Sequence, residues 1–498
     1  MRRLDIFAAA IIASLASASG LEVWAAETAA TKAPASAPRA CIGLEDFVGS
    51  DCQLTWYGIT IYGAIDVGGA WMSHGAPWDS RTPPGASYLI QKYGRSSMWT
   101  GAPNAMSQSS IGIKGTRPIG GDISLVFALD AGFDPFSLRL ANGPESVAAN
   151  AGIPLNEQTA FASSSRAGQW YNGQGYVGFS SSTYGTLTVL RQNSLTLDAV
   201  IDYDPLGASY AFSPIGYQGI TCGGGNTENC RHSTSLKYRF KLGDFRVAGL
   251  WQFGGYEQNN SSIGAYQVQA GGDIAMRGND VLSVDAIYSY VTNAASISLG
   301  PGINDARGSP IPPFLPQTLT ATISDNEAVM LVVKYATGPW KLYAGYEHIR
   351  YMAPSDPQSS FTNISGDLVC QDCQVFNNTN IVNTAFGVNG LGDKILQVMW
   401  TGAKYAITDK LDVMVGYYHY DQNSFFGTAA GGPAPCSGAE RPQCAGTFNG
   451  ISAAIDWRFA PKWDLYTGFM YSQVNGGLAN GYLQRNNIDP TVGVRFRF

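Results

Sequence analysis

The sequence has few charged residues and few histidines, and beyond its N-terminus it has no long hydrophobic run. Only 14% of its 498 residues are Asp, Glu, Lys or Arg, about half the share usual in soluble proteins. The 31 Lys and Arg against 37 acidic residues give a net charge of −6. This charge excludes a basic nucleic-acid binder and is too small for an acidic disordered chain. The lack of a later apolar run of about 18 residues excludes a bundle of membrane-spanning helices.

Glycine and aromatic residues are abundant instead. The chain has 59 Gly, 26 Tyr, 22 Phe and 11 Trp, and 45% of its residues are hydrophobic, yet its mean hydropathy is only −0.06. Such a chain can build a large folded object in which apolar and polar residues are finely interspersed. We therefore expect a long, mostly β protein.

The first 25 residues have the features of a secretory signal peptide. Met1-Arg2-Arg3 supplies positive charge, and an apolar stretch follows from Ile6 to about Leu15. Val23-Trp24-Ala25 resembles the small-residue cleavage site of a signal peptide, so we expect cleavage near Ala25. The alternative, an uncleaved membrane anchor, is disfavoured because the apolar stretch is short and rich in Ala and Ser. The predicted organisation is a signal peptide at 1–25, a short segment at 26–53 and the main folded region at 54–498.

The eight cysteines fall into four couples that are close in sequence and lie among turn-forming residues. Disulfides closing short loops in an oxidising compartment are the simplest interpretation. The C-x-x-C spacing of one couple also occurs in redox proteins, but its polar loop lacks a βαβ context. A zinc site would need a second such couple or nearby histidines. The couples are Cys41/Cys52, Cys222/Cys230, Cys370/Cys373 and Cys436/Cys444.

From Ile59 onward, segments of about ten residues alternate apolar with polar or small side chains, the period of a strand with two different faces. In 491–498 the valines and phenylalanines share one face, and Arg495 and Arg497 share the other. In 236–242 three cations share a face: Lys237, Arg239 and Lys241. A soluble sandwich also alternates, but it needs a second sheet to cover its apolar face.

The pattern predicts about sixteen strands, with short turns and long polar segments alternating between them. Short turns on one rim and long loops on the other are typical of a transmembrane β-barrel, and no fixed repeat indicates a solenoid. The predicted strands are 59–71, 107–119, 121–133, 174–182, 185–194, 233–243, 245–256, 264–275, 281–294, 327–338, 340–353, 394–407, 411–424, 448–460, 463–475 and 489–498.

A closed sheet satisfies every backbone amide in lipid, and a barrel of about sixteen strands is too wide for side chains to fill. An antiparallel transmembrane β-barrel at 54–498, with a water channel, therefore follows, and we expect 26–53 to be a periplasmic N-terminal segment. Aromatic residues near the predicted strand ends suit the girdles at the two membrane interfaces. The aromatic residues assigned to these girdles are Trp56, Tyr57, Trp251, Tyr256, Trp340, Tyr343, Trp400, Tyr417, Tyr418, Trp457, Trp463 and Tyr466.

Four stretches, in the same order along the chain, resemble the Gram-negative outer-membrane general porins. Residues 54–66 are similar to the family's first-strand pattern vTLYGxiDxG, and 110–115 to SRxGxKG. The stretch from Gly175 to Gln192 resembles xxVGLxxxxFGxxxxGRQ, with Leu190 in place of its last glycine. Phe496 and Phe498 are similar to the carboxy-terminal aromatic signal read by the assembly machinery. The cysteine couple Cys41/Cys52 further resembles porins of alphaproteobacteria.

The resemblance implies a homotrimer of sixteen-stranded barrels in the outer membrane, each with a third loop folded inward to narrow the pore. That loop would run from after Gln192 to about His232. Its acids would face basic wall residues, and Cys222/Cys230 could brace it. The predicted constriction residues are Asp198, Asp202 and Asp204 on the loop and Lys114, Arg191, Lys237 and Arg239 on the wall.

The function predicted is passive diffusion of ions and small hydrophilic solutes, without catalysis, cofactor or bound metal. A substrate-specific channel, for example for sugars, or an adhesin-like surface barrel is the alternative. A barrel-type enzyme is disfavoured because His348 and His419 have no recognisable nucleophile or acid beside them. Asp202-Tyr203-Asp204 could bind a divalent cation such as Ca²⁺. Conductance measurements would separate these possibilities.

Overall fold

The computed structural model describes residues 39–75, 88–90, 96–136, 138, 173–215, 221–222, 228–229, 231–253, 263–298, 319–352, 393–424, 444–479 and 482–498. Within these ranges no helix is long and apolar enough to cross a membrane. The predicted signal peptide lies outside them. The description below applies to these residues alone.

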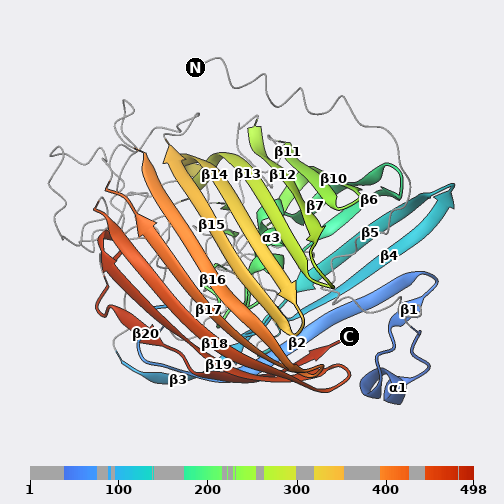
Figure 1. Ribbon diagram of the computed structural model, residues 1–498, viewed down its shortest axis with the longest axis horizontal. Coiled ribbons are helices and arrows are strands. Elements are labelled where there is room, and N and C mark those ends of the chain that lie inside the picture. The colour runs from blue at the N-terminus through green and yellow to red at the C-terminus, as the bar shows by residue number, and fades with distance from the viewer. Residues whose placement is uncertain are drawn as a thin grey trace.

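The main sheet of the described residues has nineteen antiparallel strands, of which sixteen close into a barrel (Figure 1). Each barrel strand pairs with the next along the chain, and β2 pairs with β21 to close the wall. The barrel strands are β2 Ile59–Met72, β4 Ser110–Gly120, β5 Ile123–Gly132, β6 Gly175–Ser181, β7 Gly185–Asn193, β10 Arg231–Leu242, β11 Phe245–Phe253, β12 Ile263–Ala275, β13 Val281–Ser298, β14 Leu319–Thr337, β15 Trp340–Met352, β16 Lys394–Thr408, β17 Leu411–Gln422, β18 Gly446–Ala460, β19 Trp463–Gly476 and β21 Thr491–Arg497.

The predicted closed barrel is therefore confirmed, and every predicted strand corresponds to one of these sixteen. The clearest difference is the hairpin of β13 and β14, which continues well past the predicted ends at residues 294 and 327. Residues 295–298 and 319–324 also alternate apolar with polar or small side chains, so the pattern of a strand continues there, and the prediction ended both strands too early because it assigned these residues to a long polar loop.

Smaller elements complete the described part of the chain. Short strands β1 Leu54–Trp56, β3 Met98–Pro103 and β20 Asn486–Ile488 extend the barrel sheet at its rims. A separate two-stranded sheet joins β8 Thr221–Cys222 and β9 Glu228–Asn229. The helical elements are α1 Leu44–Gly49, α3 Leu195–Tyr203 and the 3₁₀ turn η4 Gly477–Ala479.

Side chains alternate across the wall as the pattern predicts. On β18, Ile451, Ile455 and Trp457 are exposed on the outer surface, whereas Ser452 and Asp456 are buried. Because the fold places the outer surface in lipid, the apolar side chains need no second sheet to cover them. Apolar-out alternation is thus what allows one sheet to be stable in a membrane.

The girdle prediction is only partly correct. Trp56, Tyr57, Trp251, Trp340 and Trp457 are exposed. Four other aromatic residues assigned to the girdles are buried, and they belong to the inner face: Tyr343, Trp400, Tyr418 and Tyr466. Two of these four donate hydrogen bonds to residues of the segment that follows β7. The sequence pattern could not reveal this because their partners are about two hundred residues away in the chain.

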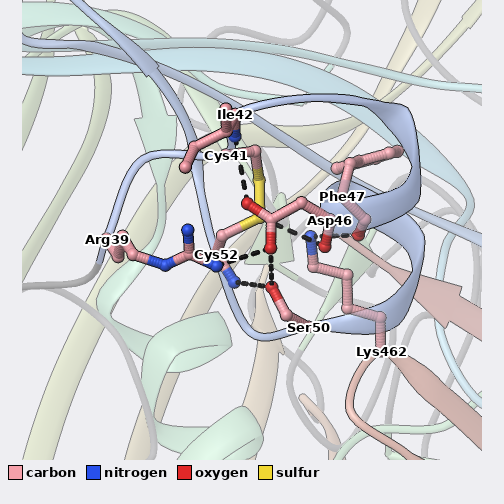
Figure 2. Close-up of a disulfide and its surroundings, with 8 residues drawn as sticks. All are labelled: Arg39, Cys41, Ile42, Asp46, Phe47, Ser50, Cys52 and Lys462. Carbon is pink, nitrogen blue, oxygen red and sulfur yellow. Dashed lines mark hydrogen bonds and ion pairs between the residues drawn. A yellow bond between two sulfur atoms is a disulfide. The ribbon is translucent and has the colours of Figure 1, made fainter.

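A disulfide-closed segment contacts the β18–β19 turn at the short-turn rim, and Figure 2 shows the side chains around the disulfide. Cys41 and Cys52 form the predicted disulfide around α1. From α1, Phe47 packs edge-on against Phe496 and Phe498, with ring centroids 5.8 Å apart in both pairs. The ammonium of Lys462, in the β18–β19 turn, donates to the Phe47 carbonyl at 2.7 Å and lies 4.2 Å from its ring centroid. We call residues 39–53 the rim clasp.

The remaining cysteines are only partly described. Cys444 is disulfide-bonded. Cys222 belongs to β8, but its side chain is not described. Cys230, Cys370, Cys373 and Cys436 lie outside the described residues, so their pairing stays a prediction.

Candidate functional site

The chain after β7 forms α3 and lies against the inner side of the barrel wall (Figure 1). Ser194 caps the helix by accepting a hydrogen bond from the Leu197 N–H at 3.0 Å. The Leu195 N–H donates to Oε1 of Gln267 on β12 at 2.6 Å, which fixes the start of the helix to the wall. The helix ends at Tyr203, just before Asp204-Pro205, because a residue that precedes proline disfavours helical conformation.

Residues 203–212 continue around the inner wall through a series of polar contacts. The indole Nε1 of Trp400 on β16 donates to the Tyr203 carbonyl at 3.1 Å. Further along, the Tyr210 hydroxyl donates to Gln108 at 2.7 Å. The Phe212 ring lies 6.3 Å from that of Tyr466 on β19. The segment 194–215, which we call the inner loop, therefore contacts strands from β12 round to β19 and the chain just before β4.

Asp198 is the inner-loop acid most directly joined to basic wall residues. Its carboxylate accepts from Nζ of Lys237 at 2.6 Å, from the Arg239 guanidinium and from the Asn193 side chain at 3.1 Å. Burial alone would raise the pKa of Asp198, but the charges of Lys237 and Arg239 outweigh it and hold the pKa below its ordinary value. The structure thus brings together one predicted loop acid and two predicted wall cations.

Asp204 is held in a different way. Its carboxylate is only 2% exposed and accepts from the Tyr418 hydroxyl and the Ala208 N–H, both at 2.6 Å. Burial raises the pKa of Asp204 to about 6. Both carboxylate oxygens are therefore used to hold the inner loop against the wall.

Asp202 is the third predicted loop acid. Burial raises the pKa of Asp202 as well, although Lys334 of β14 opposes the shift. Among the described residues no group of three or more His, Cys, Asp or Glu side chains could hold a metal ion. The Ca²⁺ interpretation of Asp202-Tyr203-Asp204 consequently finds no support in the geometry.

The contacts recorded for the two remaining predicted wall residues involve other groups than Asp198. Lys114 on β4 sits 5.1 Å from the ring centroid of Tyr62 on β2. Arg191 on β7 donates from Nε to the carbonyl of Gly173 at 3.2 Å, and Gly173 lies two residues before the start of β6. Leu190, the departure from the family glycine, has φ of 88°, a conformation that glycine adopts far more readily. The backbone therefore keeps a glycine-like shape at this point although the side chain has changed.

Sequence reasoning missed the wall residues that receive the far end of α3. The Tyr203 hydroxyl donates to Asp285 of β13 at 2.5 Å, and Arg246 of β11 contacts both, at 2.7 Å to Tyr203 and 2.5 Å to Asp285. Strand alternation could have placed Arg246 and Asp285 on the inner face. It could not have shown that a tyrosine from the preceding loop completes their network.

The geometry defines a class: a closed antiparallel barrel that is apolar outside and charged inside, with a loop packed on its inner wall. A family model described as Gram-negative porin matches residues 7–477. The chain belongs to this family of outer-membrane channel proteins.

Solved structures agree with the assignment at the level of fold. The anion-selective porin from Comamonas acidovorans superposes with a TM-score of 0.53 at 15% identity, covering 88% of this chain and 99% of that one. OmpT of Vibrio cholerae superposes with a TM-score of 0.51 at 11% identity, covering 90% of this chain and 100% of that one. The outer-membrane channel DcaP of Acinetobacter baumannii superposes with a TM-score of 0.50 at 10% identity, covering 89% of this chain and 99% of that one. No curated protein matches the sequence significantly.

Proposed function

We propose that the inner loop narrows the lumen of this porin and that small hydrophilic solutes and ions diffuse passively through the remaining opening. Size is limited by the loop, and charged side chains at its edge set the preference among solutes that fit. Asp198, Lys237 and Arg239 form the charged group nearest the start of the loop, and Arg191 and Lys114 lie on wall strands of the same barrel. No catalytic step is part of this proposal.

The observation that carries the proposal is the position of the inner loop. Segment 194–215 is almost entirely buried and is fixed to inward-facing side chains of several strands, so it occupies space inside the wall. A loop anchored at so many points does not swing freely. This arrangement supports a permanent narrowing rather than a lid.

Single-channel recording in planar bilayers tests the proposal. Purified protein should add conductance in uniform steps, with current proportional to voltage. A current that is blocked by sugars would favour the substrate-specific channel instead. No conductance steps at all would contradict the porin function and favour an adhesin or an enzyme.

We further propose a homotrimer, as the family resemblance implies, with Phe496 and Phe498 acting in assembly. Support for the second part is that both rings lie at the short-turn rim, where the Phe496 ring packs at a tilt against Trp463 with centroids 4.6 Å apart. Native mass measurement of the detergent-solubilised protein tests the trimer, and a mass of one chain would contradict it.

A further inference from the structure

Three lysines occupy neighbouring positions on the inner wall below the inner loop: Lys334 on β14, Lys341 on β15 and Lys404 on β16. Lys341 and Lys404 are direct cross-strand partners, and Lys334 lies two residues from Ala336, the β14 partner of Lys341. Lys341 follows the short Gly338-Pro339 turn almost at once, so the group lies toward the short-turn rim. We call these residues the lysine trio.

The trio faces inward. The residues next to it in sequence on β15, Trp340 and Leu342, are exposed on the outer surface, so alternation directs Lys341 into the lumen. On β16, Lys404 lies two residues beyond Gly402, where an added Cβ would meet the ring of Pro205 at 2.5 Å. The inner loop therefore passes directly beside the lysine trio, and the trio lies between the inner loop and the short turns.

The acidic residues around the trio do not balance it. Lys404 has an ion pair with Asp412 at 2.7 Å, but Arg458 binds the same carboxylate oxygen at 2.7 Å. Nζ of Lys334 donates to the Asp202 carbonyl oxygen at 3.4 Å and lies 5.1 Å from the Tyr203 ring centroid, and it interacts electrostatically with the Asp202 carboxylate without forming an ion pair with it. Among the described residues neither Lys334 nor Lys341 forms an ion pair, and Lys341 interacts electrostatically with both other lysines and with Asp412.

Like charges placed directly opposite each other on a sheet are unfavourable. Elsewhere on this wall a single cation can pair with two acids, as with Arg246, which pairs with Asp273 at 2.8 Å and with Asp285 at 2.5 Å. The trio is different because positive charge accumulates where water and solutes pass. A mobile anion can supply the missing negative charge.

We propose that the lysine trio is a transit site for small oxyanions, carrying carboxylate or phosphate groups, in the part of the lumen between the inner loop and the short-turn rim. Ammonium groups on flexible stems bind such groups as point charges without a fixed geometry. Weak binding suits a channel, since a solute must leave as readily as it enters. This proposal rests on the proposed porin function, but its residues differ from those of the predicted constriction.

The test uses the full-length protein in planar bilayers. The zero-current potential in a KCl gradient gives the ratio of chloride to potassium permeability, and added succinate or inorganic phosphate, each at increasing concentration, reports block of the chloride current. The variants are Lys341→Gln and Lys404→Gln, with Lys341→Arg to retain charge. Lys410→Gln, at an exposed residue of the β16–β17 turn, is the matched control.

We expect Lys341→Gln to lower the permeability ratio about threefold, the factor for one unit charge at about 6 Å in water. The concentration of anion needed for half block should rise by a similar factor, and Lys341→Arg should restore both values. Block by succinate alone identifies carboxylates as the ligand class, and block by phosphate alone identifies phosphates. Conducting channels in which Lys341→Gln behaves like Lys410→Gln would overturn the lysine trio alone, whereas absence of wild-type conductance would overturn the porin function itself.

Discussion

Asp204 shows how a single buried carboxylate can make the inner loop sensitive to pH. Its pKa is raised to about 6 by burial, from an ordinary value of 3.8. The folded protein therefore binds the proton more readily than the unfolded chain does. By linkage, the packed inner loop gains stability as the pH falls through about 6 and loses it as the pH rises, by at most about 3 kcal/mol.

Hydrogen exchange can measure this effect. After correction for intrinsic rates, the amides of 204 and 206–208 should exchange more slowly at about pH 4.5 than at about pH 7.5. Asp204→Asn should remove most of the difference, because an amide does not titrate. Asp122→Asn, in the exposed turn between β4 and β5, serves as the control. A full pH dependence in the Asp204→Asn variant would show that another group is responsible.

Arg191 offers a second test at a single position. If its guanidinium acts at the constriction, Arg191→Ala should shift the permeability ratio toward cations by about two- to threefold, through loss of one positive charge. Arg117→Ala, on the exposed end of β4, is a suitable comparison. An unchanged zero-current potential in the Arg191→Ala variant would place Arg191 outside the region that controls ion flow.

Among the elements, the rim clasp makes a clear stability prediction. Phe47 contacts Phe496, Phe498 and Lys462, so the clasp connects α1, the end of β21 and the β18–β19 turn. Phe47→Ala should lower barrel stability by about 1–3 kcal/mol, through lost aromatic and cation–π contacts. The temperature at which the folded barrel loses its resistance to SDS measures this.

Leu44→Ala provides the matched control for Phe47→Ala, because Leu44 also belongs to α1 but is 77% exposed. Replacing Cys41 and Cys52 with Ser should lower the same transition temperature, since the disulfide restricts the unfolded segment. Equal transition temperatures for the Leu44→Ala and Phe47→Ala variants would mean that the rim clasp does not support the barrel.

For the whole molecule, closure of the barrel depends on the pairing of β2 with β21. Phe498 ends this pairing with two backbone hydrogen bonds to Gly63, at 2.9 and 3.0 Å. Deleting Phe498 removes both bonds and a ring packed on Phe47. We expect a reduced yield of folded protein in the outer membrane, measured beside Leu483→Ala, a change at an exposed residue outside the strands. Normal yield of the shortened chain would contradict a role for Phe498 in assembly.

Sequence alternation was sufficient to predict the barrel because each strand carries its own two-faced pattern. It also placed Lys237 and Arg239 correctly on the inner face, where Asp198 meets them. It failed for Trp400 and Tyr418, which look like girdle residues until the inner loop is seen to cover them. Their partners come from a loop without a periodic pattern, and no local signal records a contact over such a separation.

The seam between β2 and β21 also has a consequence for biogenesis. All other neighbouring strands of the wall are joined by a hairpin or a loop, so each of these pairs can form as soon as both strands have reached the membrane. The seam instead unites strands from opposite ends of the polypeptide, a contact of very high sequence separation. Until β2 and β21 pair, the sheet has two edge strands with unpaired backbone groups, and each edge can pair with a strand of another molecule.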